Sequence, residues 1–324
     1  MKKSVLITVL GPTASGKSAL AVNLAKKFNG EVVSCDSRQV YRGMDLGSGK
    51  ITKKEMKGIP HHLLDVVSPK KRFDVVQYRK LAQRAINEIM QRDKVPILCG
   101  GTGFYIQAVV DGIVIPTVKP DWRLRKKLER KSVEELYQML QKLDPRRAGN
   151  IDKNNPRRLI RAIEIVIKTK KPVPRLRQDY GGQAYPVLII GIKKTPAELK
   201  TLIRKRLLKR LKSGMVAEVK RLHNPPTGGG VSWKKLEEFG LEYRWIARYL
   251  KTIKDFRNPL KLKGISEINK SVNFRKSDFF YRLQKETEHF AKRQETWFKR
   301  DKRIRWIKNQ KEAEKLIKRF FVSR

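Results

Sequence analysis

Short apolar runs alternate with amphipathic stretches along the first part of the chain. Four apolar runs predict strands, the third of them short and polar at its start: residues 5–10, 31–36, 59–67 and 95–99. Three stretches between or after them are expected to be helical: residues 19–28, 73–92 and 104–110. Strands and helices that alternate in this way predict a parallel, doubly wound sheet with helices on its faces.

Beyond residue 121 the pattern changes to basic helices. One is expected to begin at residues 155–158 (NPRR), with a buried face made by Leu159, Ile163 and Val166. A further buried strand is expected at 186–192, where six of seven residues are apolar or glycine after an initial proline.

The next helix carries a clear start signal. Thr195 is placed to cap it, Pro196 fits its first turn, and Glu198 completes a capping box three residues after the cap. Its apolar residues recur at helical spacing: Leu199, Ile203, Leu207 and Leu211. Two more helices are expected at about 232–250 and 278–299, and a final strand at 303–307. The helix at 278–299 is expected to bury one face, made by Phe279, Leu283, Phe290 and Trp297.

The first strand and first helix flank the pattern G-x-x-x-x-G-K-S, which is typical of a P-loop. Its residues are Gly11, Pro12, Thr13, Ala14, Ser15, Gly16, Lys17 and Ser18. The glycines let successive N–H groups face a bound anion, and the helix that follows adds the positive end of its dipole. Lys17 supplies a charge for phosphate oxygens, and the Ser18 hydroxyl can bind Mg²⁺. The alternative is a glycine-rich turn that matches by chance, but the flanking strand and helix favour binding of a di- or triphosphate.

We therefore expect an α/β fold: a P-loop NTPase-like parallel sheet flanked by helices, with a small inserted all-helical unit. The predicted division is a catalytic core whose first part is 1–204, a helical insertion at 205–275, and a return to the core at 276–324. No internal repeat or low-complexity tract is evident.

Polar side chains follow three of the predicted strands. Lys17 and Ser18 come after the first strand, Asp36 after the second, and Thr102 after the fourth. Ligands of open parallel sheets bind outside the carboxyl ends of the strands, so these groups are expected to share one crevice. Asp36 is suited to act as a general base or to orient a nucleophile, and Thr102 to orient it. The alternatives are a helix cap or an acid that binds a water of Mg²⁺ for Asp36, and a tight strand–helix turn for residues 100–103.

The fourth strand ends in Gly100-Gly101-Thr102-Gly103, where an ordinary NTPase would carry an acid for Mg²⁺. This argues against an NTPase but leaves open a kinase of a small hydroxyl-bearing metabolite. His61 and His62 follow a proline and are expected to anchor the third strand rather than to bind a ligand. The aromatic residues at 279–297 are expected to belong to the core rather than to stack on bases.

The chain is strongly basic, with 76 Lys and Arg against 31 Asp and Glu, a formal charge of +45. This favours a polyanionic partner, although a generally basic proteome would give the same composition. Cys35 and Cys99 are the two cysteines, which excludes a disulfide framework and suits buried thiols in a reducing cytosol. We find no cleavable signal, no apolar run long enough to span a membrane, and no histidine spacing for a metal cage.

Five motifs occur in the order known from one family. They are residues 11–18 (GPTASGKS), 36–41 (DSRQVY), 60–63 (PHHL), 100–103 (GGTG) and 291–298 (AKRQETWF), with 155–162 (NPRRLIRA) between the last two. Together they closely resemble the tRNA dimethylallyltransferases, also called tRNA isopentenyltransferases, over about residues 11–300. Because the chain has no further cysteines for a C-terminal zinc finger, it resembles the bacterial members of the family rather than the eukaryotic ones.

The resemblance implies transfer of a dimethylallyl group from dimethylallyl diphosphate to the N6 amine of the adenosine just 3′ of the tRNA anticodon, with diphosphate as the leaving group. The P-loop would hold the diphosphate with Mg²⁺ at Ser18, and Lys17 and Arg206 would neutralise it. Asp36 would accept the amine proton, and Thr102 would fix the amine. The family pattern places tRNA contacts at Asp36, Ser37, Arg38, Gln39, Thr102, Arg123, Arg157, Arg158, Leu159, Ile160, Arg161, Lys292 and Arg293.

The resemblance also implies a cytoplasmic monomer that acts on the anticodon stem-loop, without zinc or a membrane. One stretch departs from the family: the usual Gly-Tyr-Lys/Arg-Glu appears here as residues 240–244 (GLEYR), so the resemblance assigns no contacts there. Besides the kinase, a non-catalytic RNA-binding protein with a relic nucleotide fold stays open. The joint presence of Lys17, Ser18, Asp36 and Thr102 argues against that third interpretation.

Overall fold

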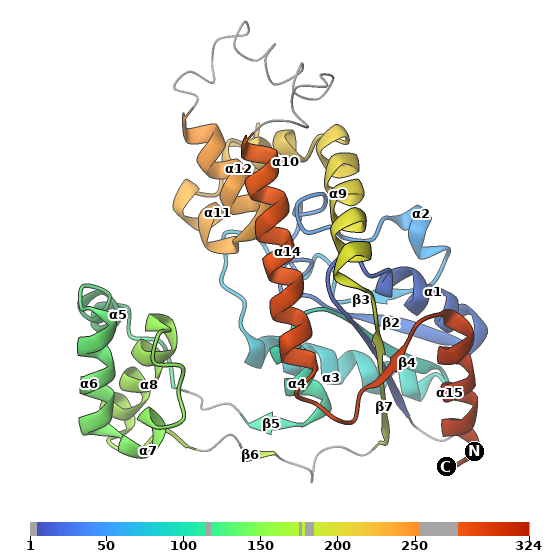
Figure 1. Cartoon of the computed structure of the whole chain (residues 1–324), viewed down its shortest axis with the longest axis horizontal. Helices are drawn as coiled ribbons and strands as arrows, with labels where there is room; N and C mark the ends of the chain where they lie inside the picture. The colour runs from blue at the N-terminus through green and yellow to red at the C-terminus, as the bar shows by residue number, and fades with distance from the viewer. Residues whose placement is uncertain (1–4, 115–117, 175–176, 179–184, 253–277, 324) are drawn as a thin grey trace, which may run out of the picture. The chain divides into compact units, whose positions relative to one another are not determined.

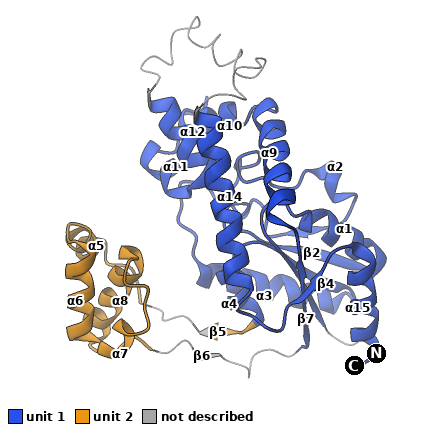
Figure 2. Cartoon of the chain, viewed as in Figure 1, with its two compact units in different colours: residues 1–110, 183–324 blue, residues 111–182 orange. Residues whose placement is uncertain are grey.

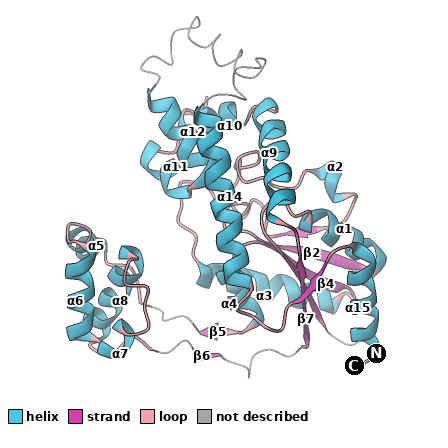
Figure 3. Cartoon of the chain, viewed as in Figure 1, coloured by secondary structure: helices cyan, strands magenta, loops and turns pink. Residues whose placement is uncertain are grey.

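The computed structural model describes residues 5–114, 118–174, 177–178, 185–252 and 278–323 (Figure 1). The chain divides into two compact units, one of residues 1–110 and 183–324 and the other of residues 111–182 (Figure 2). The first unit contains the sheet, and the second is mainly helical (Figure 3).

The sheet of the first unit has six strands in the order β3-β2-β4-β1-β7-β8, and every pairing in it is parallel. The strands are β1 (Leu6–Leu10), β2 (Gly30–Cys35), β3 (His61–His62), β4 (Val95–Gly100), β7 (Val187–Ile192) and β8 (Arg305–Ile307). Gly100 pairs with Leu10 on one side and with Cys35 on the other. The ends of β1, β2 and β4 are therefore level, which confirms that the residues following them meet at one edge of the sheet.

Side chains of the strands alternate between two packed layers. Ile7 and Val9 of β1 contact a core that includes α1 (Lys17–Lys27) and α15 (Gln310–Val322). Leu6 and Leu10 face the opposite layer, with α3 (Val75–Gln91) and α4 (Gly103–Val110). Such alternation buries both faces of a parallel sheet, as the apolar runs predict.

The second of these layers continues into a group of helices beyond the sheet's edge (Figure 1). It contains α9 (Pro196–Lys212), α10 (Met215–His223), α11 (Trp233–Phe239), α12 (Leu241–Thr252) and α14 (Asp278–Phe298), and the short α2 (Lys53–Met56) lies in the loop after β2. The capping box of α9 is present, and all four residues of its predicted apolar stripe are buried. The single helix predicted at 232–250 is wrong: Gly240, at φ 78°, separates α11 from α12.

The buried face of α14 differs from the predicted one. The residues it buries are Phe280, Leu283, Gln284, Thr287, Ala291, Gln294 and Phe298. Of the four predicted core residues only Leu283 is fully buried; Phe279, Phe290 and Trp297 lie at the border of this face. The helix turns polar side chains inward, and one of them, Gln294, reaches the functional site described below.

The second unit packs its own small core. It contains α5 (Trp122–Leu128), α6 (Val133–Leu143), α7 (Pro145–Ala148) and α8 (Pro156–Thr169), and the antiparallel pair β5 (Ile113–Val114) and β6 (Arg177–Gln178). Leu159, Ile163 and Val166 of α8 are buried in this core, as the sequence predicts. Glu164, with no exposed surface, forms ion pairs with Arg125 and Arg161, both at 2.6 Å.

This division differs from the predicted boundaries. The separate unit is formed by residues 111–182, which the sequence analysis assigned to the core, because α5 to α8 bury apolar residues mainly against one another. The described part of the predicted insertion, residues 205–252, clusters with the sheet-containing unit, and 253–275 lies outside the described residues. No helix among the described residues is long and apolar enough to cross a membrane.

Candidate active site

The P-loop leads from β1 into α1 and contains three residues of positive φ, the first of them Gly11 at φ 158°. Gly16, at φ 89°, precedes the first turn of the helix, and Ala14 has φ 62°. The Ser15 N–H donates to the Pro12 carbonyl at 3.3 Å, which closes the loop. N–H groups in the first turn of a helix have no intrahelical acceptor, so those at the start of α1 can bind an anion. The Ser15 hydroxyl is buried inside the loop and has no hydrogen-bond partner in the described part of the chain.

Two cations lie beside this loop. The Lys17 ammonium donates to the Pro12 carbonyl at 3.2 Å. From α9, the Arg206 guanidinium donates to the Thr13 hydroxyl at 3.4 Å and to the Gly49 carbonyl at 2.9 Å. Burial lowers the pKa of Lys17, and the charge of Arg206 lowers it further. Two partly desolvated like charges are stabilised by an anion between or beside them, as a bound diphosphate would be.

The acceptor side is formed by the residues after β2 and β4. The Thr102 hydroxyl accepts from the Ser37 N–H at 3.0 Å, and the Asp36 carboxylate accepts from the Arg38 N–H at 2.8 Å. The negative charge of Asp36 raises the pKa of Lys17, against the larger opposing effects, and it raises that of Arg206 likewise. The structure therefore brings together the four predicted catalytic residues around one P-loop.

Two predicted tRNA-binding residues hold the loop after β2. The Arg38 guanidinium donates to the Phe239 carbonyl at 2.6 Å and lies 5.7 Å from the centre of its ring. The Gln39 amide accepts from the Ser34 hydroxyl at 3.2 Å and donates to the Gly49 carbonyl at 3.3 Å. Part of the hydrogen-bonding capacity of both side chains is therefore used within the protein.

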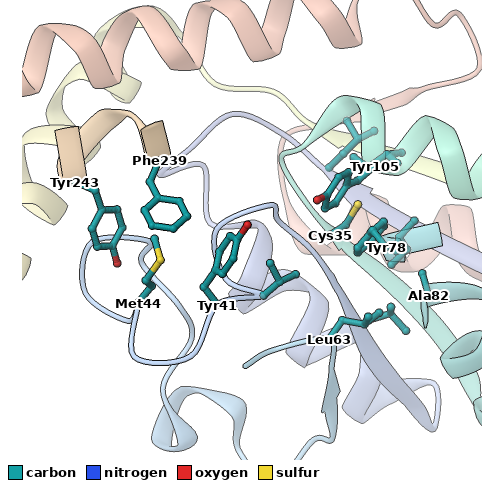
Figure 4. Close-up of a cluster of buried hydrophobic side chains, with 14 of the residues drawn as sticks. Cys35, Tyr41, Met44, Leu63, Tyr78, Ala82, Tyr105, Phe239 and Tyr243 are labelled. Atoms are coloured by element: carbon teal, nitrogen blue, oxygen red, sulfur yellow. The ribbon is translucent and has the colours of Figure 1, made fainter. Parts of the chain in front are cut away.

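Aromatic side chains pack against this loop (Figure 4). Tyr41 and Phe239 meet edge to face with ring centres 4.9 Å apart, and Tyr243 lies next to Phe239. Tyr78 of α3 stacks on Tyr105 of α4 with ring centres 4.0 Å apart.

A buried carboxylate that no sequence motif predicts fixes the same loop. Glu218 of α10 accepts from the N–H groups of Asp45, Leu46 and Gly47 and from the Tyr243 hydroxyl, at 2.6–3.0 Å. Arg210 of α9 donates to the carbonyls of two residues in this loop, Leu46 and Gly47. No motif marks Glu218, because its three backbone partners lie more than 170 positions away in the chain.

The remaining predicted tRNA-binding residues fall into three groups. Exposed side chains suited to contact phosphates are Arg123, Arg157, Arg158, Lys292 and Arg293. Arg161 is half-buried and is held by Glu164 and by the Val118 carbonyl. Leu159 and Ile160 are buried in the core of the second unit, so their side chains are not placed to touch a nucleic acid.

The histidine pair has the structural role that the sequence predicts. His62 lies 2.7 Å from the buried Glu31, which also pairs with Arg92 and Lys94 at 2.8 Å. The thiols of Cys35 and Cys99 are buried, and burial raises the pKa of both, that of Cys99 to about 12. Among the described residues no group of three or more His, Cys, Asp or Glu side chains could hold a metal ion.

Comparisons with known proteins agree with this geometry. The family model described as IPP transferase matches residues 39–301. The chain is 38% identical over 314 residues, 95% of this chain and 93% of the relative, to a tRNA dimethylallyltransferase of Carboxydothermus hydrogenoformans. It is 40% identical over 306 residues, 93% of this chain and 91% of the relative, to tRNA dimethylallyltransferase 2 of Trichlorobacter lovleyi.

Solved structures give the same result. A tRNA isopentenylpyrophosphate transferase of Bacillus halodurans superposes with a TM-score of 0.65 at 32% identity, covering 99% of this chain and 96% of that one. A eukaryotic dimethylallyltransferase solved while acting on tRNA gives a TM-score of 0.70 at 26% identity, covering 91% of this chain and 70% of that one. The kinase interpretation is not favoured by any of these matches. This chain belongs to the IPP transferase family and is an enzyme of the tRNA dimethylallyltransferase type.

Proposed function

We propose that this enzyme transfers the dimethylallyl group of dimethylallyl diphosphate to the N6 amine of the adenosine just 3′ of a tRNA anticodon. The observation that carries the proposal is the grouping of Lys17, Arg206, Asp36 and Thr102 around one P-loop. Two cations face the donor side, and a carboxylate and a hydroxyl face the acceptor side. A phosphoryl-transfer enzyme would be expected to carry a Mg²⁺-binding acid after β4, where this chain has residues 100–103 (GGTG).

On the donor side, the bond between the allylic carbon and the diphosphate oxygen breaks, and its electron pair stays on that oxygen. The N–H groups at the start of α1, Lys17 and Arg206 stabilise the charge that develops there. Because these groups are fixed before the reaction, they need little reorganisation as the bond breaks. The two phosphates leave together as diphosphate.

On the acceptor side, the nitrogen lone pair of the amine forms the new bond to the allylic carbon. The amine then carries an extra proton, which Asp36 accepts. The Thr102 hydroxyl, already held by the Ser37 N–H, is placed to fix the amine. Since an adenine cannot reach such a site while it is stacked, the base leaves the anticodon loop stack to enter it.

The proposal includes Mg²⁺ as an aid to donor binding. The Ser18 hydroxyl, in the first turn of α1, and the diphosphate oxygens are the ligand types that Mg²⁺ accepts together with water. The ion would neutralise part of the diphosphate charge.

The exposed basic residues are proposed to bind the tRNA backbone. Arg123, Arg157 and Arg158 present charge on the second unit, and Lys292 and Arg293 on α14. When the logarithm of the binding constant is plotted against the logarithm of the salt concentration, each neutralised phosphate contributes about −0.7 to −0.9 to the slope. A monomer in the cytoplasm is part of the same proposal.

The direct test is incubation with dimethylallyl diphosphate and unmodified tRNA, followed by mass analysis of the nucleosides. We expect one adenosine beside the anticodon to gain a five-carbon unit, with no need for ATP. Lys17→Ala is the matched control and should lose nearly all turnover while its affinity for tRNA stays close to that of the wild type. Transfer of the γ-phosphate of ATP to a small acceptor, with tRNA of unchanged mass, would refute the proposal.

A further inference from the structure

One side chain joins the two halves of the active site. Gln294 of α14 is 7% exposed. Its Oε1 accepts from the Thr13 N–H of the P-loop at 2.8 Å, and its Nε2 donates to the Gly101 carbonyl at 2.8 Å. The P-loop follows β1 and Gly101 follows β4, so the two loops come from neighbouring strands. The helix that links them is distant in sequence, because Gln294 lies 281 positions from Thr13 and 193 positions from Gly101.

The loop after β4, residues 100–103, is called the acceptor loop here and is shaped to receive this helix. A Cβ at Gly101 would lie 2.3 Å from the Gln294 Nε2, and a Cβ at Gly103 would lie 2.3 Å from the Trp297 ring. A side chain at position 101 would therefore displace the Gln294 amide, and one at position 103 would force the Trp297 ring away from the loop. Thr102 lies between these glycines, and its hydroxyl therefore depends on how α14 holds the loop.

The bond to Thr13 also divides the P-loop into two parts. The Thr13 N–H is occupied by Gln294, whereas its hydroxyl accepts from Arg206 at 3.4 Å. The N–H groups that remain for a diphosphate are those nearer the start of α1. A movement of the P-loop around the anion would be carried through one amide group to the Gly101 carbonyl, one residue before Thr102.

We propose that Gln294 is a positioning residue that couples occupation of the diphosphate site to the geometry of the acceptor loop. The inference rests on the proposed function for its purpose, since that reaction needs donor and acceptor atoms aligned at once. Misplacement by about 1 Å can cost on the order of 100-fold in rate. Loss of Gln294 is therefore expected to lower the rate at saturation by about 10- to 100-fold while donor and tRNA affinities change little.

The coupling itself is tested without any reaction, using inorganic diphosphate as the probe. Hydrogen exchange of the peptide over residues 100–106 is measured with and without saturating diphosphate, and the affinity for diphosphate by calorimetry. In the wild type we expect diphosphate to slow exchange there by about fivefold or more, the lower end of usual coupling between sites. In Gln294→Met, which keeps the volume and removes both bonds, diphosphate should bind with similar affinity and change the exchange by less than about twofold.

Gln284→Met is the matched control. Gln284 lies on the same helix, is 6% exposed, and bonds to Arg204 and Glu288 rather than to either loop. This variant should keep the diphosphate effect. If Gln294→Met does not fold, Gly101→Ala replaces it, because the added methyl would displace the Gln294 amide while leaving the side chain present.

Several results would overturn the inference: no exchange effect in the wild type, an effect retained in Gln294→Met, equal loss in Gln284→Met, or loss of diphosphate binding itself in Gln294→Met. The proposed function is judged separately, by whether the wild type modifies tRNA. An inactive wild type whose loop still responds to diphosphate through Gln294 would refute the function and leave the coupling intact.

Discussion

Replacing Glu218 by Gln tests whether the loop at residues 44–50 is held by a buried carboxylate. In the structure, Oε2 accepts from the N–H groups of Asp45 and Leu46, and Oε1 accepts from the Gly47 N–H and the Tyr243 hydroxyl. A glutamine offers one accepting oxygen and one donating NH₂ group. The Tyr243 hydroxyl can rotate to accept from the amide, but at least one backbone N–H must then face another donor.

The size of the effect follows from this count. One buried donor left without an acceptor costs about 1–3 kcal/mol, and bonds to a charged acceptor are stronger than those to a neutral one. We expect Glu218→Gln to lower the free energy of unfolding by about 2–4 kcal/mol, measured by urea titration at pH 7. The same change should weaken donor binding, because Arg206 bonds to the Gly49 carbonyl at the end of this loop.

Glu237→Gln is the control for this experiment. Glu237 forms ion pairs with Arg248 and Lys251, whose side chains are half exposed, and pairs of this kind contribute about 0–1 kcal/mol. A loss for Glu218→Gln no greater than that of this control would show that the carboxylate does not fix the loop, and the argument from its four bonds would be wrong.

Three further predictions concern the acid, the basic surface and pH. Asp36→Asn should lower the single-turnover rate by about 10²–10⁴-fold, the usual contribution of a positioned acid or base, and Thr102→Ala should cost about 1–3 kcal/mol of activation free energy; an unchanged rate in Asp36→Asn would remove that residue from the mechanism. Arg157→Glu with Arg158→Glu should weaken tRNA binding and reduce its salt dependence without changing the affinity for the small donor. If tRNA binding does not depend on salt, the formal charge of +45 reflects a generally basic composition and not a role in binding tRNA. Desolvation raises the pKa of Glu31, but hydrogen bonds from Lys94, His62 and Arg92 together outweigh it and lower the pKa to about 2, so the stabilising effect of Glu31 is present above pH 4.5 and is lost as the pH falls toward 2. Glu31→Gln should therefore unfold more easily at pH 7 and lose stability less steeply on acidification, and a variant with the same loss of stability at low pH as the wild type would contradict this assignment.

The elements that sequence predicts best are those whose signals are local. The P-loop, the strand ends that carry Asp36 and Thr102, and the capping box of α9 are each encoded within a few residues. The sequence also predicts that the strands are parallel, but it does not predict their order in the sheet. That β4 lies between β1 and β2, which places Thr102 beside both other loops, is a property of the whole sheet.

The contacts that the sequence could not predict join distant segments. Gln294 bonds to a P-loop N–H 281 positions away, and Glu218 to backbone N–H groups more than 170 positions away. The buried face of α14 was misplaced for the same reason. Its polar residue Gln294 faces inward because it has acceptors and donors there, whereas periodicity counts only apolar residues.

The second unit shows a different limit. Arg161 and Arg125 resemble other surface arginines in the sequence, yet both pair with the fully buried Glu164. Charge reversal at Arg161 would leave that carboxylate beside another acid and test folding rather than tRNA binding. Arg157 and Arg158, which are exposed on α8, are the better probes.

The central claim is that the P-loop holds a diphosphate that leaves intact while carbon is transferred to tRNA. It is tested most directly by counting diphosphate and modified adenosine from the same reaction, with ATP present and labelled at its γ-phosphate. We predict equal amounts of diphosphate and modified adenosine, no label transfer, and loss of both products in Lys17→Ala. Diphosphate released without modified adenosine, or label moved from ATP to an acceptor, would contradict the account.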